Sequence, residues 1–225
     1  MKITALIVVL LAGLALAAPA PNSQLGHLNQ EQVPVGVSLV DVICSQPFVY
    51  ANLQNGLGFS QPNAWMLADD FNYPVDGYID NIEIWAIYAS GNATGFNVQL
   101  RSDGGAGPGA IVESYTSGTP YHENTGLSQW GYGLWYTEFT PSANITFTGG
   151  TKYWLAMQTT GGAGAHYWLA TNQTWEDQTH FSQDNGGTWQ TGFAAWGAYY
   201  EQFMILSGAE TSLTRDSWGA IKSLF

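Results

Sequence analysis

The sequence predicts an all-β protein, a single antiparallel β-sandwich with a signal peptide before it and a short helix after it. Three observations lead to this class. First, short stretches of alternating apolar and polar residues are separated by Gly, Asn, Asp and Ser. Second, about ten such strands occur at the spacings found in sandwiches and barrels. Third, helical periodicity is confined to the end of the chain. Aromatic residues make up 14% of the 225 residues, enough to build a core and to exclude a disordered chain.

Residues 1–17 are expected to be a signal peptide. Lys2 gives the start of the chain a positive charge, residues 3–16 form an apolar run, and Ala15 and Ala17 satisfy the small-x-small rule for cleavage. The run is shorter than the roughly 20 apolar residues that a membrane-spanning helix needs, and no later stretch is long and apolar enough. We therefore expect a secreted protein, with residues 18–36 as a flexible leader rich in Pro, Gln, Asn and Gly.

The charge balance limits the partners. The chain has 5 basic and 17 acidic residues, a formal net charge of −12, and loss of Lys2 with the signal peptide makes it 4 − 17 = −13. Phosphate contacts need clustered Lys and Arg, so we expect no nucleic-acid partner. The single cysteine, Cys44, excludes a disulfide framework. In an oxidising compartment it either packs as a small apolar group at a strand end, which we favour, or bridges to another chain.

Residues 37–208 are expected to form the sandwich. Residues 37–43 alternate for part of their length, and residues 96–100 alternate strictly before the Gly-rich tight connection 103–109. Segment 77–90 contains one of the longest strands, expected to be central and half-covered on its second face. The first face of this strand is formed by Ile82, Ile84, Ala86 and Tyr88.

One internal similarity stands out. Residues 153–160 are nearly repeated as residues 167–174, with the Gly-rich segment 161–166 between them. Two aromatic strands joined by such a turn predict an antiparallel hairpin. The similarity is local, because a repeat architecture needs several copies and no third copy occurs.

Short motifs also follow one another in a recognisable order. They are Ala68-Asp69-Asp70-Phe71, Gly77-Tyr78-Ile79-Asp80-Asn81-Ile82, Val98-Gln99-Leu100-Arg101-Ser102-Asp103-Gly104-Gly105, Gly107-Pro108-Gly109, Gly150-Thr151-Lys152-Tyr153-Trp154-Leu155, Asp184-Asn185-Gly186-Gly187-Thr188-Trp189 and a final strand over 200–206. Over residues 65–208 the chain thereby resembles secreted bacterial β-sandwich modules of the choice-of-anchor kind, which accompany varied C-terminal surface-attachment signals. The resemblance implies a jelly-roll-like extracellular module without known catalysis, and it supplies no catalytic residues.

Motifs that carry catalysis are scarce. The metalloprotease, nucleophile-elbow, phosphate-loop and dinucleotide motifs are absent, and the four histidines lie too far apart in sequence to predict zinc. Glu83 and Glu138 are strand-borne candidates for the two carboxylates of a β-sandwich glycoside hydrolase or lyase. Glu83 is the only acid within its strand core, so no same-face pair two residues apart occurs there, and we expect no enzyme.

Asp69 and Asp70 are adjacent on an expected strand, where successive side chains point to opposite faces and cannot both serve one site. One of them could bind a structural Ca²⁺ together with Asp103 and loop carbonyls. The alternative, which we favour, is that one accepts hydrogen bonds from turn N–H groups and the other faces water. No other cofactor is expected. Residues 184–187 are likewise expected to form a turn rather than a ligand set.

The surplus of aromatic residues is the best indication of function. Trp and Tyr rings stack on the apolar faces of sugars, so an acidic, aromatic-rich groove would suit a neutral polysaccharide. The alternative is that a sandwich with few Leu residues fills its core with aromatics, which accounts for Trp85, Trp154 and Trp168. The candidates for glycan stacking are Trp130, Tyr132, Trp135, Tyr136, Trp175 and Trp189.

Residues 209–225 are expected to be a linker and a short amphipathic tail. Asp216 or Ser217 can cap a helix whose apolar residues form one stripe. So short a helix is marginal alone in water, so it needs something to pack against. We hypothesise a sorting or anchoring partner, and the alternative is docking onto the sandwich. The residues expected to contact such a partner are Trp218, Ile221, Lys222 and Phe225.

These features together predict an extracellular or cell-surface module that is not an enzyme and that works in surface attachment or binding. The first alternative is a carbohydrate-binding module that uses exposed Trp and Tyr, and the second is a β-sandwich glycoside hydrolase or lyase. The expected partners are a polysaccharide or another cell-surface polymer. Retention on a polysaccharide without release of reducing sugar would separate binding from hydrolysis.

Overall fold

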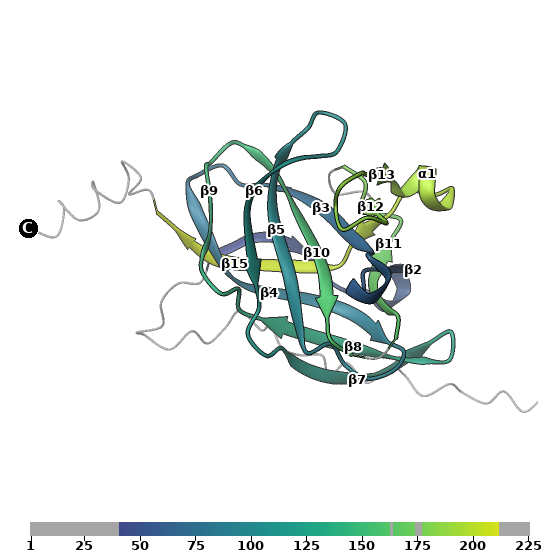
Figure 1. Ribbon diagram of the computed structural model, residues 1–225. Coiled ribbons are helices and arrows are strands. Elements are labelled where there is room, and N and C mark those ends of the chain that lie inside the picture. Colours follow the sequence, from purple (N-terminus) through teal and green to yellow (C-terminus); the bar gives the residue numbers. More distant parts are fainter. Residues whose placement is uncertain (1–40, 163, 174–176, 212–225) are drawn as a thin grey trace, which may run out of the picture. The chain divides into compact units, whose positions relative to one another are not determined.

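The computed structural model of the protein describes residues 41–162, 164–173 and 177–211. Two antiparallel sheets pack against each other in this part of the chain (Figure 1), so the predicted all-β sandwich is confirmed. No helix among the described residues is long and apolar enough to cross a membrane. Predictions that lie outside the described residues concern the signal peptide, the leader, and the side chains of Trp175, Trp218, Ile221, Lys222 and Phe225.

Fifteen strands are present in the described residues, more than the ten or so expected, because several are only two or three residues long. The nine-stranded sheet contains β1 (Asp41–Gln46), β2 (Leu53–Gly58), β4 (Gly77–Tyr88), β7 (Tyr121–Gln129), β8 (Tyr132–Phe139), β9 (Ile145–Phe147), β11 (His166–Thr171), β14 (Glu201–Gln202) and β15 (Met204–Glu210). The six-stranded sheet contains β3 (Met66–Asn72), β5 (Gly95–Asp103), β6 (Pro108–Thr116), β10 (Lys152–Thr160), β12 (His180–Ser182) and β13 (Gln190–Thr191). The short helices are η1 (Tyr50–Asn52), η2 (Gln61–Asn63) and α1 (Gly192–Trp196).

Strand β4 is central, as its length and alternation predict. It pairs with β15 and then β11 along one side and with β9 and then β8 along the other. Its predicted inner face is buried in the core between the sheets. The second face is partly covered, because the ring of Phe48 stacks on Trp85 with centroids 5.8 Å apart. Successive side chains of a strand point to opposite faces, so one set of β4 residues lies in the core and the other set lies under the partial cover.

The predicted hairpin of residues 153–160 and 167–174 is wrong. β10 pairs with β3 and β5 in the six-stranded sheet, whereas β11 pairs with β2, β4 and β14 in the nine-stranded sheet. The Gly-rich connection therefore leads from one sheet to the other instead of closing a hairpin within one sheet. The two tryptophans of the repeat also face differently: Trp168 belongs to the core between the sheets, and Trp154 belongs to a separate cluster.

That separate cluster lies on the outer face of the six-stranded sheet. It consists of Met66, Ala68, Trp154 and Ala156, and Trp189 packs on it from the loop after β12. Neighbouring residues in these strands, such as Leu155 in β10, point the other way into the main core. Both faces of the six-stranded sheet are thus covered at this end.

The ends of the sandwich differ from the predicted boundaries by a few residues. The first strand continues through Cys44 to Gln46 instead of ending at residue 43, so Cys44 lies within β1. Its side chain is partly buried and packs against the main core, in agreement with the favoured apolar role. The last strand continues past residue 208 to Glu210, because residues 208–210 still pair with the start of β4.

Candidate functional site

An open groove lies over the outer face of the six-stranded sheet, across β5, β6 and β10. Its volume is about 590 Å³. Phe96, Val98 and Leu100 of β5 pack in the main core, so Asn97 and Gln99, which alternate with them, point outward into the groove. None of the lining residues is charged; they are Gln61, Met66, Asn97, Val98, Gln99, Ser114, Tyr115, Thr116, Ser142, Gln158 and Asn185.

Three amide side chains in the groove are hydrogen-bonded in a row. Nδ2 of Asn97 donates to Oε1 of Gln158 at 3.3 Å, and Nε2 of Gln158 donates to Oδ1 of Asn185 at 3.0 Å. Asn97 and Gln158 are direct cross-strand neighbours in β5 and β10. Each amide orients the next. The carbonyl oxygen of Asn97 therefore remains as an acceptor at one end of the row, and the NH₂ group of Asn185 remains as a donor at the other. Such an arrangement suits hydroxyl groups, which both donate and accept.

Arg101 holds the neighbouring amide in place. Its guanidinium donates to Oε1 of Gln99 at 2.8 Å, to the carbonyl of Gly109 at 2.9 Å and to the carbonyl of Gly186 at 2.8 Å. It also lies over the ring of Trp189, 5.1 Å from the centroid. Because Oε1 of Gln99 is engaged, its amide NH₂ group is left to donate to a ligand. Arg101 is thereby buried and its donors are directed to the protein rather than to the groove.

The turn after β12 carries Asn185 to the groove. The carboxylate of Asp184 accepts hydrogen bonds from the hydroxyl of Ser182 at 2.7 Å and from the backbone N–H of Thr188 at 2.8 Å. The bond from Thr188 is the main reason why the pKa of Asp184 is lowered to about 2. Asn185 and Gly186 have φ angles of 57° and 86°, left-handed values typical of a tight turn. The predicted turn over residues 184–187 is confirmed.

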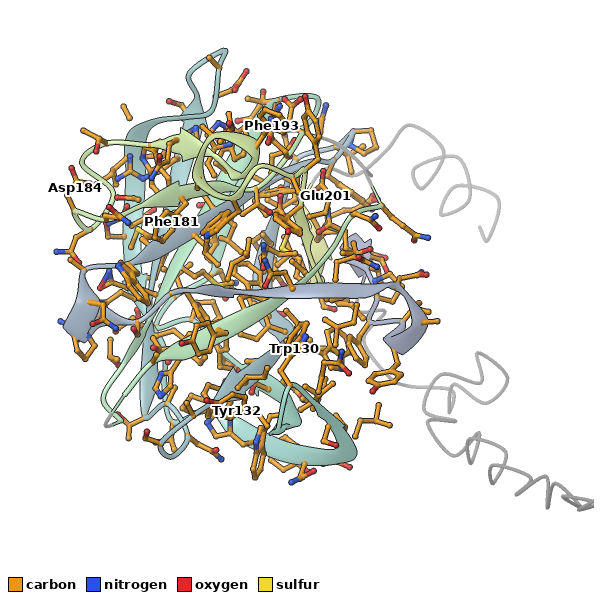
Figure 2. All side chains as sticks on the ribbon, turned by 90° about the vertical axis from the view of Figure 1, so that its right-hand side faces the viewer. Trp130, Tyr132, Phe181, Asp184, Phe193 and Glu201 are labelled. Atoms are coloured by element: carbon orange, nitrogen blue, oxygen red, sulfur yellow. The ribbon has the colours of Figure 1, made fainter. Side chains whose placement is uncertain are left out.

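Two of the predicted stacking residues, Trp130 and Tyr132 (Figure 2), lie outside this groove, at the tip of the β7–β8 hairpin. Trp130 and Gly131 form a two-residue loop with φ angles of 50° and 85°, the values of a type I′ turn. A bulky residue seldom adopts this backbone conformation. Trp130 is 49% exposed and Tyr132 is 45% exposed. Both line a small pocket of about 120 Å³ with Asn55, Gly56, Ile87 and Tyr167.

The other predicted stacking residues do not lie beside Trp130 and Tyr132 on one surface. Trp135 points to the opposite side of β8 and packs against the main core. Tyr136 is half-buried and donates a hydrogen bond to Glu138 at 3.0 Å. Trp189 covers the cluster beside the amide groove, with one face occupied by Arg101. Trp175 lies outside the described residues.

The predicted roles of Asp69 and Asp70 need correction. Both carboxylates are buried, so neither faces water. Although adjacent on β3, they come together with Glu201: one carboxylate oxygen from each of the three lies within 4.8 Å of the others. Asp103 belongs to a different place, where it is exposed and accepts hydrogen bonds from the Trp154 indole at 3.1 Å and from a turn N–H.

A second pair of acids also meets. Glu83 in β4 lies directly opposite Glu138 in β8 on one face of the nine-stranded sheet. Side chains in such positions have Cβ atoms about 4.5–5.5 Å apart. Burial, and then the charge of Glu138, raise the pKa of Glu83, while a hydrogen bond from Tyr136 opposes the rise. The sequence singles out Glu83 and Glu138 as strand-borne candidates, but only the pairing of β4 with β8 shows that they lie opposite each other.

The amides of the groove are not among the predicted site residues. The strict alternation of residues 96–100 predicts a strand and by itself assigns no role to its polar members. The polar half, Asn97 and Gln99, was the available signal for an outward-facing polar surface. No protein-family model matches the sequence, and a comparison with curated proteins finds no match either. The function has to be inferred from the geometry of these sites.

Proposed function

We propose that the protein is a non-catalytic extracellular module that binds a neutral, hydroxyl-rich polymer, a polysaccharide, in the amide groove. The observation that carries this proposal is a groove of about 590 Å³ without a charged lining residue, in a chain of net charge −12. A charged ligand would be matched by ions of opposite sign, and an apolar one by apolar walls. Amides and hydroxyls match sugar hydroxyls.

Several further features support a role in attachment or binding. The N-terminal segment has the composition of a signal peptide, and the order of motifs resembles choice-of-anchor modules. The amide row and the Arg101 hydrogen bonds fix the groove before a ligand arrives, which lowers the entropy lost on binding. The exposed aromatic pair of Trp130 and Tyr132 is a second surface on which a sugar ring could stack.

The test is binding of the purified protein to soluble polysaccharides by affinity electrophoresis and calorimetry. Neutral glucans, xylans and mannans should retard the protein, whereas acidic polymers such as alginate and pectate should not, because the chain itself is acidic. Substituting both Gln99→Ala and Gln158→Ala should weaken binding by at least tenfold, since two hydrogen bonds of about 1 kcal/mol each are lost.

Two control variants separate the groove from other surfaces. Gln183→Ala removes an exposed amide next to the same turn but outside the groove, and it should leave affinity unchanged. Trp130→Asn removes the exposed ring and places a residue suited to the left-handed turn, so the fold should be kept. If Trp130→Asn abolishes binding and the double glutamine variant does not, the binding site is the hairpin tip and the groove proposal is wrong.

The acid pair supports a second candidate function, hydrolysis of a glycan. Glycoside hydrolases use two carboxylates about 5 to 10 Å apart, and environments that push their pKa values apart assign the acid and the base. Glu83 and Glu138 lie on facing strand positions, and the pKa of Glu83 is raised. Release of reducing sugar from a bound polysaccharide, lost in Glu83→Gln and in Glu138→Gln, would favour this function. Binding without release favours the first.

A further inference from the structure

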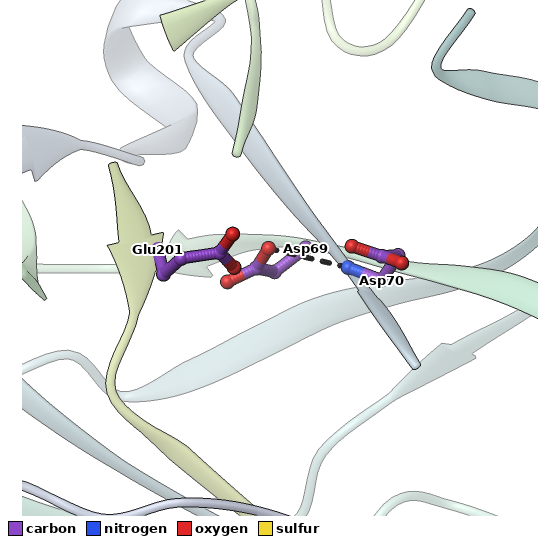
Figure 3. A group of neighbouring side chains, drawn as sticks. All are labelled: Asp69, Asp70 and Glu201. Carbon is purple, nitrogen blue, oxygen red and sulfur yellow. Dashed lines mark hydrogen bonds between the residues drawn. The ribbon is translucent and has the colours of Figure 1, made fainter. Parts of the chain in front are cut away.

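Three buried carboxyl groups from both sheets meet at one place in the sandwich. Asp69 and Asp70 come from β3 of the six-stranded sheet, and Glu201 comes from β14 of the nine-stranded sheet. All three side chains are fully buried. Figure 3 shows the carboxyl group of Glu201 directed at that of Asp69, and one oxygen from each of the three residues lies within 4.8 Å of the others.

Both aspartates accept hydrogen bonds from backbone N–H groups. Asp69 accepts from the backbone N–H of Gln202 at 2.6 Å and from that of Asp70 at 3.2 Å. Asp70 accepts from the backbone N–H of Asp177 at 3.1 Å, and its other oxygen lies 3.3 Å from Nζ of Lys152. Every carboxylate oxygen has about two lone-pair sites, so the two bonds to Asp69 leave its carboxylate capacity for a further contact.

Glu201 is different, and this is the independent sign of a ligand. Neither of its carboxylate oxygens has a hydrogen-bond partner among the described residues, although the side chain is fully buried and directed into the cluster. The amide oxygen of the next residue, Gln202, is also buried without a donor in the described part of the chain. A buried acceptor without a donor is costly, and a buried charge without a partner is more so.

The charges of the cluster are not balanced by the side chains described. Lys152 is the one cation that contacts it in the described ranges, and it pairs with Asp70 and with Asp177. No cation contacts Asp69 or Glu201 within those ranges. Burial, and then the charge of Asp70, raise the pKa of Asp69 well above its ordinary value, and burial, and then the charge of Asp69, raise the pKa of Glu201. Two remedies exist for such a pair: a shared proton or a bound cation.

We propose that Asp69, Asp70 and Glu201 bind one Ca²⁺ ion that ties β3 to β14. Calcium–oxygen distances are about 2.3–2.6 Å, so two ligands of one ion lie no more than about 5 Å apart, and the cluster meets this limit. The donors are all oxygens, which selects a hard cation over zinc or copper. Ca²⁺ fits better than Mg²⁺, because Mg²⁺ usually keeps several waters and uses only one or two carboxylates. A shared proton, in contrast, would leave one oxygen of Glu201 without a partner.

The test is direct measurement of metal content and of cation-dependent stability on the purified protein. Elemental analysis after dialysis against Ca²⁺ should find one ion per chain. Protein stripped with a chelator should bind Ca²⁺ in calorimetry, and millimolar Ca²⁺ should raise the melting temperature by about 5 to 10 °C, the shift expected when a ligand binds only the folded state of a domain this size. Mg²⁺ at the same concentration should raise it by less than half as much.

The variant Glu201→Gln should lose the response to Ca²⁺ while melting, in chelator, at or above the temperature of the stripped wild type, because it removes an uncompensated buried charge. A purely structural role would lower melting equally with and without Ca²⁺. Glu123→Gln, which changes an exposed acid elsewhere, is the matched control and should keep the full response.

The proposal is overturned if the wild type binds no Ca²⁺ and its melting temperature is unmoved by 10 mM Ca²⁺. It is also overturned if Glu201→Gln keeps the response. Stability that depends on pH but not on Ca²⁺ would assign the cluster to a shared proton. Should Glu201→Gln fail to fold, metal content and melting of the wild type still decide the question. None of these measurements depends on the amide groove, so failure here leaves the proposed function untouched.

Discussion

Replacing Arg101 with Met is expected to destabilise the protein by about 3 kcal/mol and to weaken polysaccharide binding. The guanidinium donates to the side chain of Gln99 and to the carbonyls of Gly109 and Gly186. A hydrogen bond to a charged group contributes about 1.5–3 kcal/mol, and Gly186 is buried, so its carbonyl would be left without a donor. The variant no longer pays the desolvation cost of burying the Arg101 charge, and this gain limits the net loss of stability to about 3 kcal/mol.

Urea denaturation followed by tryptophan fluorescence measures this loss as a lower midpoint at unchanged slope. In a domain of this size the melting temperature should fall by about 6 to 12 °C. Arg101→Lys keeps the charge but not the three-way donor geometry, so it should recover only part of the stability. A loss of less than about 1 kcal/mol in Arg101→Met would refute the reasoning, because it would mean that the turn is held without the guanidinium.

Two further outcomes are expected. Gly208→Ala should lower the free energy of unfolding, measured with urea, by about 3 kcal/mol or more, because the new Cβ would overlap the carbonyl oxygen of Tyr78 at the β15–β4 bulge. The control Gly118→Ala should be nearly neutral, because its Cβ would meet no atom within 4 Å. A similar midpoint for both would contradict the steric account. His122 and His166 should also cost stability as pH drops below 6.5: burial lowers their pKa values, so the unfolded chain binds protons that the folded protein does not. Each contributes at most about 1.4 kcal/mol per pH unit. The raised pKa values of Asp69 and Glu201 act in the opposite sense, so the comparison is between wild type and His122→Gln. An identical change in melting temperature between pH 7 and 5 in both proteins would refute it.

Local patterning made part of the fold predictable. The alternation in β4 fixed its inner face, and the Asp-Asn-Gly-Gly segment fixed a turn, because both depend on residues close in sequence. The pairing of β10 and β11 was mispredicted for the opposite reason. Two similar strands joined by glycines can pair with each other or cross between sheets, and the choice depends on partners far along the chain.

The candidate sites were less predictable than the fold. Asn97 and Gln158 are neighbours only because β5 and β10 pair in one register, and Glu201 reaches Asp69 only because the two sheets pack together. Neither the strand register nor the packing of the two sheets can be read from residues close together in the sequence. Adjacent strand residues do point to opposite faces, but the conclusion that Asp69 and Asp70 cannot serve one site was too strict. One oxygen from each lies close to the carboxyl group of Glu201, which comes from another strand.

The order of strands in the larger sheet has a consequence for how the chain folds. β15, the last described strand, lies between β1, the first, and β4, the central one. The middle of the sheet therefore cannot close until synthesis has passed residue 210, and the closing contacts join segments far apart in the chain, which makes folding slow. A nascent chain of this topology cannot complete its larger sheet while residues before 210 are being made. Under the proposed extracellular function, that delay would help to keep the chain unfolded for export.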